Sequence, residues 1–353
     1  MGDLGCATHR AAVVDRETAQ IVVELDDITD LWWQRVLDNH SEAEVTVGRA
    51  GHCCSRLSDV RSWRHELAIW RGRNEVWRGP IMQTRYGATH TTLRARDRWA
   101  WLDVRDVRET LEVEGDHTQA ALKLIDEALR HPDGFPDETE IRHFLDARPT
   151  GVWGSFEYKP HQRSVGAELR NLAQGPLNAT FVGRSLVIFG PAPLSTTALL
   201  QDKDFLADLE VLEDGYSTAT RVTVVGQGVV ASCGGTDPYY GLIERTINDQ
   251  TITSVEGARA LACATQASNN YPPVVLSVPN GVQLAPTAPV TVDELVPGVE
   301  IPVWSKRTCR DINQALTLTQ LEVRESPGNG EQVNVTVAPG TVLTGTNTGV
   351  FSG

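Results

Sequence analysis

The alternation of polar and apolar residues with a period of two runs through the first hundred residues, and at about residue 104 it changes to the 3.6-residue period of a helix. Glu44-Val45-Thr46-Val47 shows this alternation, and so do residues 91–97. Residues 66–70 and 75–79 flank Gly72-Arg73-Asn74, which predicts an antiparallel hairpin with a short loop. The first hundred residues are therefore expected to form a small antiparallel barrel or sandwich, and the change of period marks a new unit.

Two helices and a hairpin are expected in this second unit. Asp116 can cap a helix that ends before His131-Pro132, and Ser164 can cap a second helix that Gly175 stops. Asn178–Val182 and Ser185–Phe189 are then separated by two residues only, which is a tight-hairpin signal. Residues 104–198 are thus expected to be an α+β insert.

The rest of the chain returns to strands, expected at residues 220–225, 251–252, 274–278, 315–323 and 332–337. One helix, capped by Ser254, interrupts them, and the Gly- and Thr-rich stretch 340–353 is expected to be an extended arm.

The expected fold class is mainly β with an α+β insert, in which two small antiparallel barrel-like domains carry α/β accessory segments. A chain of 353 residues usually divides into several packing units. The predicted domains are 1–103, 104–198 and 199–353, the last with its accessory helix and C-terminal arm.

Charge and hydropathy restrict the class of partner. With a net charge of −14, no broad face can be strongly basic without an even more acidic face elsewhere, whereas binding of a phosphate backbone by Lys and Arg needs the opposite balance. The chain contains no run of about 18 apolar residues and no signal peptide at its start, so we expect no membrane insertion and synthesis in a cytoplasm. Only four of the 32 basic residues are Lys, as in proteins of GC-rich genomes.

The cysteines show neither the spacing of a zinc site nor that of a disulfide scaffold. They are Cys6, Cys53, Cys54, Cys233, Cys263 and Cys309. His52 lies beside two of them, but adjacent residues of a strand point to opposite faces and cannot easily converge on one ion. We therefore expect unpaired structural or incidental thiols, and neither a metal nor a cofactor.

The sequence contains no nucleophile elbow, Walker loop, zinc-protease helix or kinase motif set. Gly226-Gln227-Gly228 lacks the third glycine of a dinucleotide fingerprint and continues as a strand. His143 with Asp146 could act as an acid–base pair, although a surface pair is the more common meaning. The carboxylates that could serve a glycosidase are better explained as solvated surface; they are Asp26, Asp27, Glu109, Glu112 and Glu114. No catalytic residue is predicted.

Tryptophans are dense in the first domain and could in principle stack sugars or bases. They are Trp32, Trp33, Trp63, Trp70, Trp77, Trp99 and Trp101. Because they occupy predicted strand positions, we expect them in the core or in a subunit contact.

A series of short segments in a fixed order resembles the minor tail proteins of long-tailed actinobacteriophages, whose hubs look like the phage baseplate hub and the type VI secretion spike base. In the first domain the segments are 31–39, 71–81 and 95–102; downstream they are 202–206, 213–215, 221–224, 240–244 and 295–299. The resemblance covers nearly the whole chain, and none of these segments is catalytic.

The resemblance implies a virion structural protein of the tail tip, assembled in the host cytoplasm. In this family two similar β-rich domains let three subunits imitate a sixfold ring. The homotrimer would adapt the sixfold tail tube to a threefold tip and let DNA and the tape measure protein pass. The implied partners are the distal tail protein, the tail tube, the tape measure protein and other tail-tip or spike proteins.

Two other functions stay open from the sequence. A tail-tip enzyme that degrades the host wall would need paired carboxylates in one cleft and would show turnover. A carbohydrate-binding adsorption module would use the tryptophans and bind sugar as a monomer.

Overall fold

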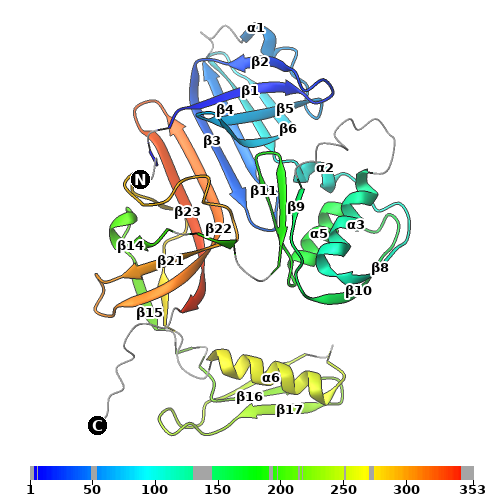
Figure 1. Ribbon diagram of the computed structural model, residues 1–353, viewed down its shortest axis with the longest axis vertical. Helices are drawn as coiled ribbons and strands as arrows, with labels where there is room; N and C mark the ends of the chain where they lie inside the picture. The colour runs from blue at the N-terminus through cyan, green and yellow to red at the C-terminus, as the bar shows by residue number, and fades with distance from the viewer. Residues whose placement is uncertain are drawn as a thin grey trace.

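The computed structural model describes residues 4–5, 7–48, 54–129, 145–190, 194–196, 198–213, 215–216, 218–249, 252–269 and 274–342 (Figure 1). Several positions discussed above lie outside the described residues, namely Cys6, His52, Cys53, His143 and the segment 343–353 of the predicted arm.

The chain is mainly β, with 49% of it in strands and 15% in helices, and it carries an α+β insert, which confirms the predicted fold class. The largest sheet contains thirteen strands in the order β13-β21-β22-β3-β4-β7-β6-β5-β1-β2, with β14, β20 and β23 attached to the side. Its strands are β1 (His9–Asp15), β2 (Ile21–Leu25), β3 (Ile28–Val36), β4 (Glu42–Gly48), β5 (His65–Arg71), β6 (Asn74–Tyr86), β7 (His90–Arg96), β13 (Leu194–Ser195), β14 (Leu200–Gln201), β20 (Val282–Gln283), β21 (Val299–Ser305), β22 (Ile312–Ser326) and β23 (Gly330–Val342).

The described strands form open sheets and no closed barrel, which corrects the barrel-like form expected for the β-rich segments. The first seven strands cannot close on themselves because one edge of β3 pairs with β22 from the end of the chain. In that pairing Trp33 lies opposite Val323 and Leu31 lies opposite Glu325. The hairpin expected around Gly72 is present as the antiparallel pair β5 and β6.

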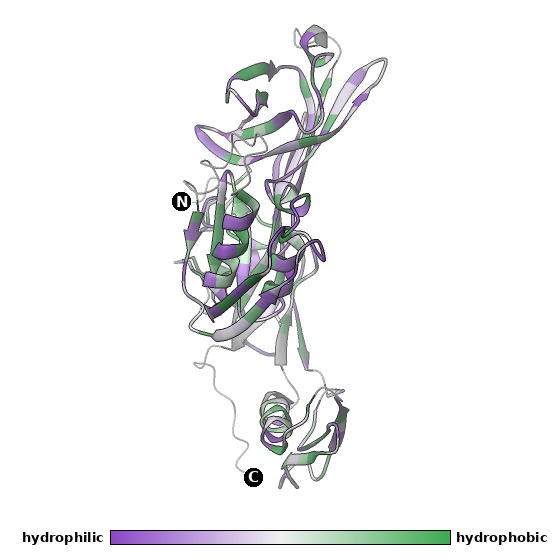
Figure 2. Cartoon of the chain, turned by 90° about the vertical axis from the view of Figure 1, so that its right-hand side faces the viewer, coloured by the Kyte–Doolittle hydropathy of each residue, from purple (hydrophilic) through white to green (hydrophobic). Residues whose placement is uncertain are grey.

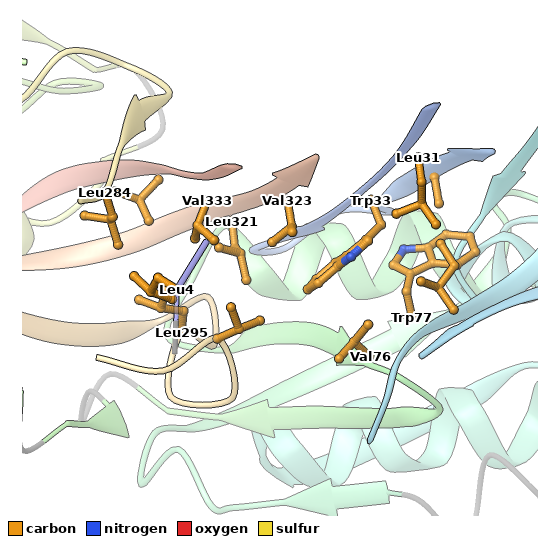
Figure 3. Packing of buried hydrophobic residues seen from close by; sticks show 14 of the residues in the cluster. Leu4, Leu31, Trp33, Val76, Trp77, Leu284, Leu295, Leu321, Val323 and Val333 are labelled. Atoms are coloured by element: carbon orange, nitrogen blue, oxygen red, sulfur yellow. The ribbon is translucent and has the colours of Figure 1, made fainter. Parts of the chain in front are cut away.

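The first and last segments also share one hydrophobic core (Figure 3). Leu31, Trp33 and Trp77 from the first hundred residues pack in the same cluster as Leu321 and Val323 from β22. Alternate residues of each strand reach this core because successive side chains of a strand point to opposite faces. The division into units 1–103, 104–198 and 199–353 stays a prediction.

The insert has its own core and lies against the large sheet. Its elements are α2 (Trp99–Asp103), β8 (Leu111–Asp116), α3 (His117–Leu129), β9 (Leu145–Ala147), β10 (Trp153–Tyr158), α5 (Val165–Ala173), β11 (Asn178–Val182) and β12 (Ser185–Phe189). Both predicted caps are present: the carboxylate of Asp116 accepts the N–H of Thr118 at 2.8 Å, and the hydroxyl of Ser164 accepts the N–H of Ala167 at 3.2 Å.

The predicted hairpin β11–β12 joins the insert to the large sheet. At its turn, Gly183 has φ of +59° and donates its N–H to the carbonyl of Val76 at 3.3 Å. A Cβ at this position would lie 2.8 Å from the carbonyl oxygen of Glu75, so only glycine permits the approach. On β11, Ala179 exchanges hydrogen bonds with Asp38 of the β3–β4 turn, at 2.7 and 2.8 Å.

A small α/β unit forms one end of the molecule (Figures 1 and 2). It contains β16 (Arg221–Val225), β17 (Val230–Gly234), β18 (Glu244–Asn248) and α6 (Val255–Asn269). The paired strands β15 (Glu210–Glu213) and β19 (Val274–Ser277) precede and follow it; the remaining short elements of the chain are α1 (Cys54–Leu57) and the 3-10 turn η1 (Asp202–Asp204). The hydroxyl of Ser254 caps α6 as predicted, by accepting the N–H of Gly257 at 3.0 Å.

Two expectations for this small unit are wrong. Cys233 on β17 and Cys263 on α6 form a disulfide, whereas the sequence predicted unpaired thiols. The two are 30 residues apart and become neighbours only because α6 packs on the sheet. A strand was expected at 251–252, but Ile252 lies outside the described strands, and its carbonyl accepts the N–H of Gln227 in a turn at 2.8 Å. Thr251 lies outside the described residues.

Candidate functional site

The carboxylates weighed as catalytic candidates lie at the surface on separate elements. Asp26 and Asp27 are in the turn between β2 and β3, and Glu112 and Glu114 are on the outer face of β8. Glu109 precedes that strand and is exposed too. Their exposure on two distant surface segments means that they do not form the pair of carboxyl groups facing one cleft that a glycosidase needs.

Asp146 lies in strand β9, not in a helix, and forms an ion pair with Arg148 at 3.3 Å.

Gly226-Gln227-Gly228 is a turn between β16 and β17, in which the N–H of Gly226 donates to the carbonyl of Val229 at 2.8 Å. The strand therefore continues into a hairpin, as the sequence indicated, and not into a phosphate-binding helix.

The tryptophans of residues 1–103 are buried or half-buried. Trp33, Trp77, Trp99 and Trp101 are buried, and Trp32, Trp63 and Trp70 are half-buried. Their rings pack within the molecule: Trp63 and Trp101 are 4.9 Å apart, and the guanidinium of Arg16 lies 4.6 Å above the ring of Trp101. These rings are therefore used for packing, and they do not form an open platform for a sugar.

A buried ion network, which the sequence analysis missed, holds α2 against the sheet. Glu66 on β5 accepts from Arg78 at 2.6 Å and from Arg98 at 3.2 Å, and all three side chains are buried. Burial alone would raise the pKa of Glu66, but Arg98 and Arg78 hold that pKa below its ordinary value. The sequence did contain a signal for this network, because Glu66 and Arg78 are charged residues at inward-facing positions of two paired strands. Because all three side chains are buried and paired with one another, we interpret the network as structural.

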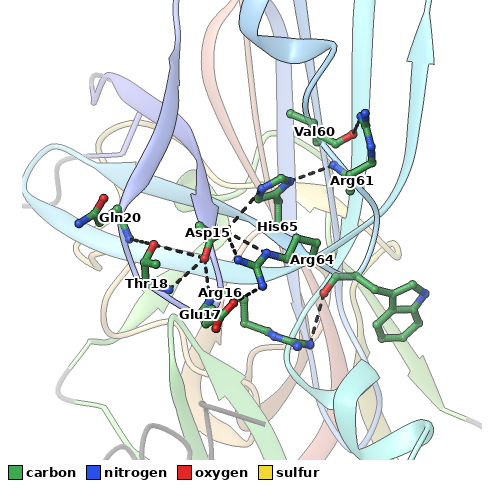
Figure 4. A network of polar contacts seen from close by, with 10 residues as sticks. Asp15, Arg16, Glu17, Thr18, Gln20, Val60, Arg61, Arg64 and His65 are labelled. Atoms are coloured by element: carbon green, nitrogen blue, oxygen red, sulfur yellow. Dashed lines mark hydrogen bonds and ion pairs between the residues drawn. The ribbon is translucent and has the colours of Figure 1, made fainter. Parts of the chain in front are cut away.

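A second polar cluster holds the β1–β2 turn against the segment that precedes β5 (Figure 4). Asp15 accepts the N–H groups of Glu17 and Thr18, both at 2.9 Å, and pairs with Arg64 at 2.9 Å. The Nδ1 atom of His65 accepts the N–H of Arg61 at 2.9 Å, so its other nitrogen carries the proton and faces Asp15 at 3.7 Å. Neither nitrogen of His65 is left to act as a base.

A third polar cluster lies where β1, β3 and the β22–β23 hairpin meet. The side chain of His9 is 1% exposed, and its Nδ1 lies 2.6 Å from Glu325. Its Nε2 lies 3.2 Å from the indole nitrogen of Trp33. Glu331, also buried, is paired with Arg71 at 2.6 and 2.9 Å. This cluster joins residues more than 300 positions apart, which is why no local sequence signal could have found it.

The described surface includes two features that assembly would use. In the large sheet, β2 pairs only with β1 among the described strands, so one of its edges is open. Large apolar side chains are exposed on the small α/β unit and on β10. They are Trp153, Tyr216, Val230, Tyr239, Leu242, Ile243 and Val255.

Within the described residues there is no group of His, Cys, Asp or Glu that could hold a metal ion. None of the described helices has the length and hydropathy needed to cross a membrane.

Comparison with known proteins gives a likeness in structure. No protein-family model and no curated protein matches this sequence. A tail protein from Neisseria meningitidis is 16% identical and superimposes with a TM-score of 0.60 over 93% of this chain and 96% of that one. The 43 kDa tail protein of prophage MuSo2 from Shewanella oneidensis is 13% identical, with a TM-score of 0.62 over 93% and 97%.

The likeness extends to secretion machinery. A chain of the Francisella PdpA–VgrG complex is 8% identical, with a TM-score of 0.54 over 96% of this chain and 53% of that one. At these identities the comparisons establish the fold. Over nearly its whole length, this chain has the fold of phage tail proteins and shares it with part of a VgrG-complex chain.

Proposed function

We propose that this protein is a virion structural protein, the hub at the tip of a long phage tail. The observation that carries the proposal is the match in fold to two tail proteins over 93% of this chain and at least 96% of theirs. Because the match extends over nearly the full length of both chains, the proposal concerns the shared fold as a whole and not a single small module.

We infer that three copies close into a ring that adapts the sixfold tail tube to the threefold tip. A closed ring satisfies each heterologous contact, and the open edge of β2 and the exposed apolar side chains described above supply surface for such contacts. An edge strand of a large sheet readily pairs with a strand of another chain. The predicted partners are the distal tail protein, the tail tube, the tape measure protein and other tail-tip or spike proteins.

The charge supports a passage through which DNA slides without sticking. Each chain carries −14, so a trimer carries −42 (3 × −14). Acidic walls repel the phosphate backbone, and weak binding is what a conduit for DNA and the tape measure protein requires. The protein would be assembled in the host cytoplasm and kept in the virion, with no catalytic role.

The test is the mass of the purified protein by light scattering, with negative-stain imaging of the same fraction. A trimer of three times 38.6 kDa with a central hole is expected. Because a hub can need a neighbour as a template, the measurement is repeated with the distal tail protein added. A monomer under both conditions would contradict the ring.

The same sample tests the two other functions. Hydrolysis of host cell wall that is lost in a variant of one exposed carboxylate, such as Glu112→Gln, would favour an enzyme. Binding of host-wall oligosaccharide by the monomer would favour an adsorption module. Neither activity is expected.

A further inference from the structure

The Cys233–Cys263 disulfide joins the two layers of the small α/β unit. Cys233 lies on β17, and Cys263 lies on α6, the helix that packs on the sheet β17-β16-β18 (Figure 1). The bond closes a loop of chain that contains β18 and the first half of α6. It therefore holds the helix against the edge of the sheet that β17 forms.

The contact between these two layers is otherwise made by small side chains. Among the described residues of α6, Ala258 and Ala262 are buried, and they pack in one cluster with Val222 and Val224 of β16. A methyl group buries little apolar surface, so the helix gains little free energy from this contact. The position of α6 thus depends on the disulfide more than it would if larger side chains filled the core.

The disulfide lies at the margin of this core. β17 is an edge strand, because it pairs with β16 and has no second neighbour among the described strands. Cys233 and Cys263 are half-buried, whereas Val222 and Val224 on the central strand are fully buried. Thiol–disulfide exchange requires that a thiolate approach one sulfur of a disulfide, and a half-buried position at an edge permits that approach.

The compartment in which the chain is made would keep the two cysteines reduced. This step rests on the proposed function, in which the protein is assembled in the host cytoplasm and acts in the virion. Cytosolic glutathione and thioredoxin keep thiols reduced, whereas disulfides persist in oxidising surroundings outside the cell. The chain would therefore meet a reducing environment while the tail is built and an oxidising one after the host cell is lysed.

We propose that Cys233 and Cys263 form a redox switch, which is an open dithiol during assembly and closes to the disulfide after release. The oxidant is a small disulfide such as glutathione disulfide. One cysteine thiolate attacks it and forms a mixed disulfide, and one glutathione thiolate leaves; the other cysteine thiolate then displaces the second glutathione. The protein gives up two electrons and two protons, and one glutathione disulfide becomes two glutathione thiols. The open form lets α6 separate from the sheet, and the closed form fixes it there.

The first experiment counts thiols before and after release. The full-length protein is produced in a bacterial cytoplasm, intact cells are quenched with acid, and the denatured proteins are alkylated with N-ethylmaleimide for peptide mass spectrometry. We expect both Cys233 and Cys263 to be alkylated in the cells, and neither after lysis and incubation with glutathione disulfide. Cys309, which is free and exposed, is the internal control: it is alkylated in the cells and should afterwards stop at the mixed disulfide with glutathione.

The second experiment measures what the switch does to the small unit. Subtilisin cleavage within residues 218–269 is compared between the oxidised protein and the same protein kept reduced. We expect the reduced form to be cleaved there at least about tenfold faster, because separation of α6 exposes backbone to the protease. Cys263→Ser cannot close the switch and should be cleaved at the fast rate with or without reductant. Cys309→Ser is the matched control and should respond to reductant as the unchanged protein does.

Any one of three results would overturn the proposal: a disulfide already closed in intact cells, thiols that stay reduced in glutathione disulfide, or equal cleavage rates of the two forms. If Cys263→Ser fails to fold, the reduced and oxidised forms of the unchanged protein still give the comparison of rates. The mass and shape of the ring are measured separately, so failure of the switch is distinguished from failure of the proposed hub.

Discussion

The large sheet and the small α/β unit are stabilised in different ways. The sheet combines strands from both ends of the chain over an extended core that includes Leu31, Trp33, Trp77, Leu321 and Val323. The described core of the small unit contains five buried residues, all Ala or Val: Ala219, Val222, Val224, Ala258 and Ala262. Burial of that little apolar surface stabilises a fold weakly, so the Cys233–Cys263 disulfide makes a larger relative contribution there.

The largest expected effect is on the sheet. Trp33 is fully buried where β3 faces β22, so Trp33→Ala should leave a cavity and lower the free energy of unfolding by about 3 to 5 kcal/mol. Urea unfolding followed by far-UV circular dichroism measures it. The matched control is Trp153→Ala, because that side chain is 74% exposed and its loss should change stability by less than about 0.5 kcal/mol. Equal effects of the two variants would show that the core does not depend on the junction of the two chain segments.

The next effect should be confined to the small unit. Reducing the Cys233–Cys263 bond, which spans 30 residues, is expected to destabilise this unit by about 3 kcal/mol. Amide hydrogen exchange, read separately over residues 218–269 and over β3 and β22, distinguishes the two regions. Faster exchange in the small unit alone is the expected result. Cys309, which is free and exposed, provides the control: Cys309→Ser should leave exchange unchanged in both regions. Uniform acceleration would mean that the two regions unfold as one.

Local features of the sequence predicted local structure well. The hairpin β11–β12 and the caps Ser164 and Ser254 depend on residues within a few positions of one another, and the structure confirms them. Strand β21 was missed, because Pro302 cannot donate to a ladder and argues against a strand, although it pairs with Ala315.

Contacts between distant residues could not be predicted from the sequence. The pairing of β3 with β22, the disulfide and the contact of His9 with Glu325 each require the completed fold. The open form of the sheet follows from the first of these, since nothing in residues 1–103 says that β3 will pair with a strand more than 280 positions away. The candidate site was missed for the same reason.

A smaller effect should appear when pH is changed. Burial raises the pKa of Asp97 to about 7, against the hydrogen bonds that Ser41 and Trp99 donate to its carboxylate. The folded protein thus keeps a proton that the unfolded chain releases above its ordinary pKa of 3.8. The contribution of this proton to the free energy of unfolding is therefore fully present below about pH 4 and is lost as the pH rises from about 4 to 7. We expect a loss on the order of 1 to 2 kcal/mol between pH 5 and 7.

Urea midpoints at several pH values, compared between the unchanged protein and Asp97→Asn, isolate this contribution. The variant cannot titrate at this position, so its stability should vary less over the same range. A larger decline in the variant than in the unchanged protein would show that other groups set the pH dependence of the large sheet.

The smallest effect is expected on the exposed face of the strand pair β8–β10 in the insert. In the pair β8–β10, Glu112 lies directly opposite Glu157, and both side chains are exposed. Like charges at directly opposite positions destabilise a strand pair, so Glu112→Lys should turn a repulsion into an attraction worth about 0.2 to 1 kcal/mol. The gain should be seen at low salt and should shrink as salt is added, because exposed charges are screened. The control is Glu109→Lys, which makes the same change of charge at a position outside β8, where the side chain has no cross-strand partner. A similar gain in this control would mean that the reduced net charge stabilises the protein, and not the register of β8 with β10.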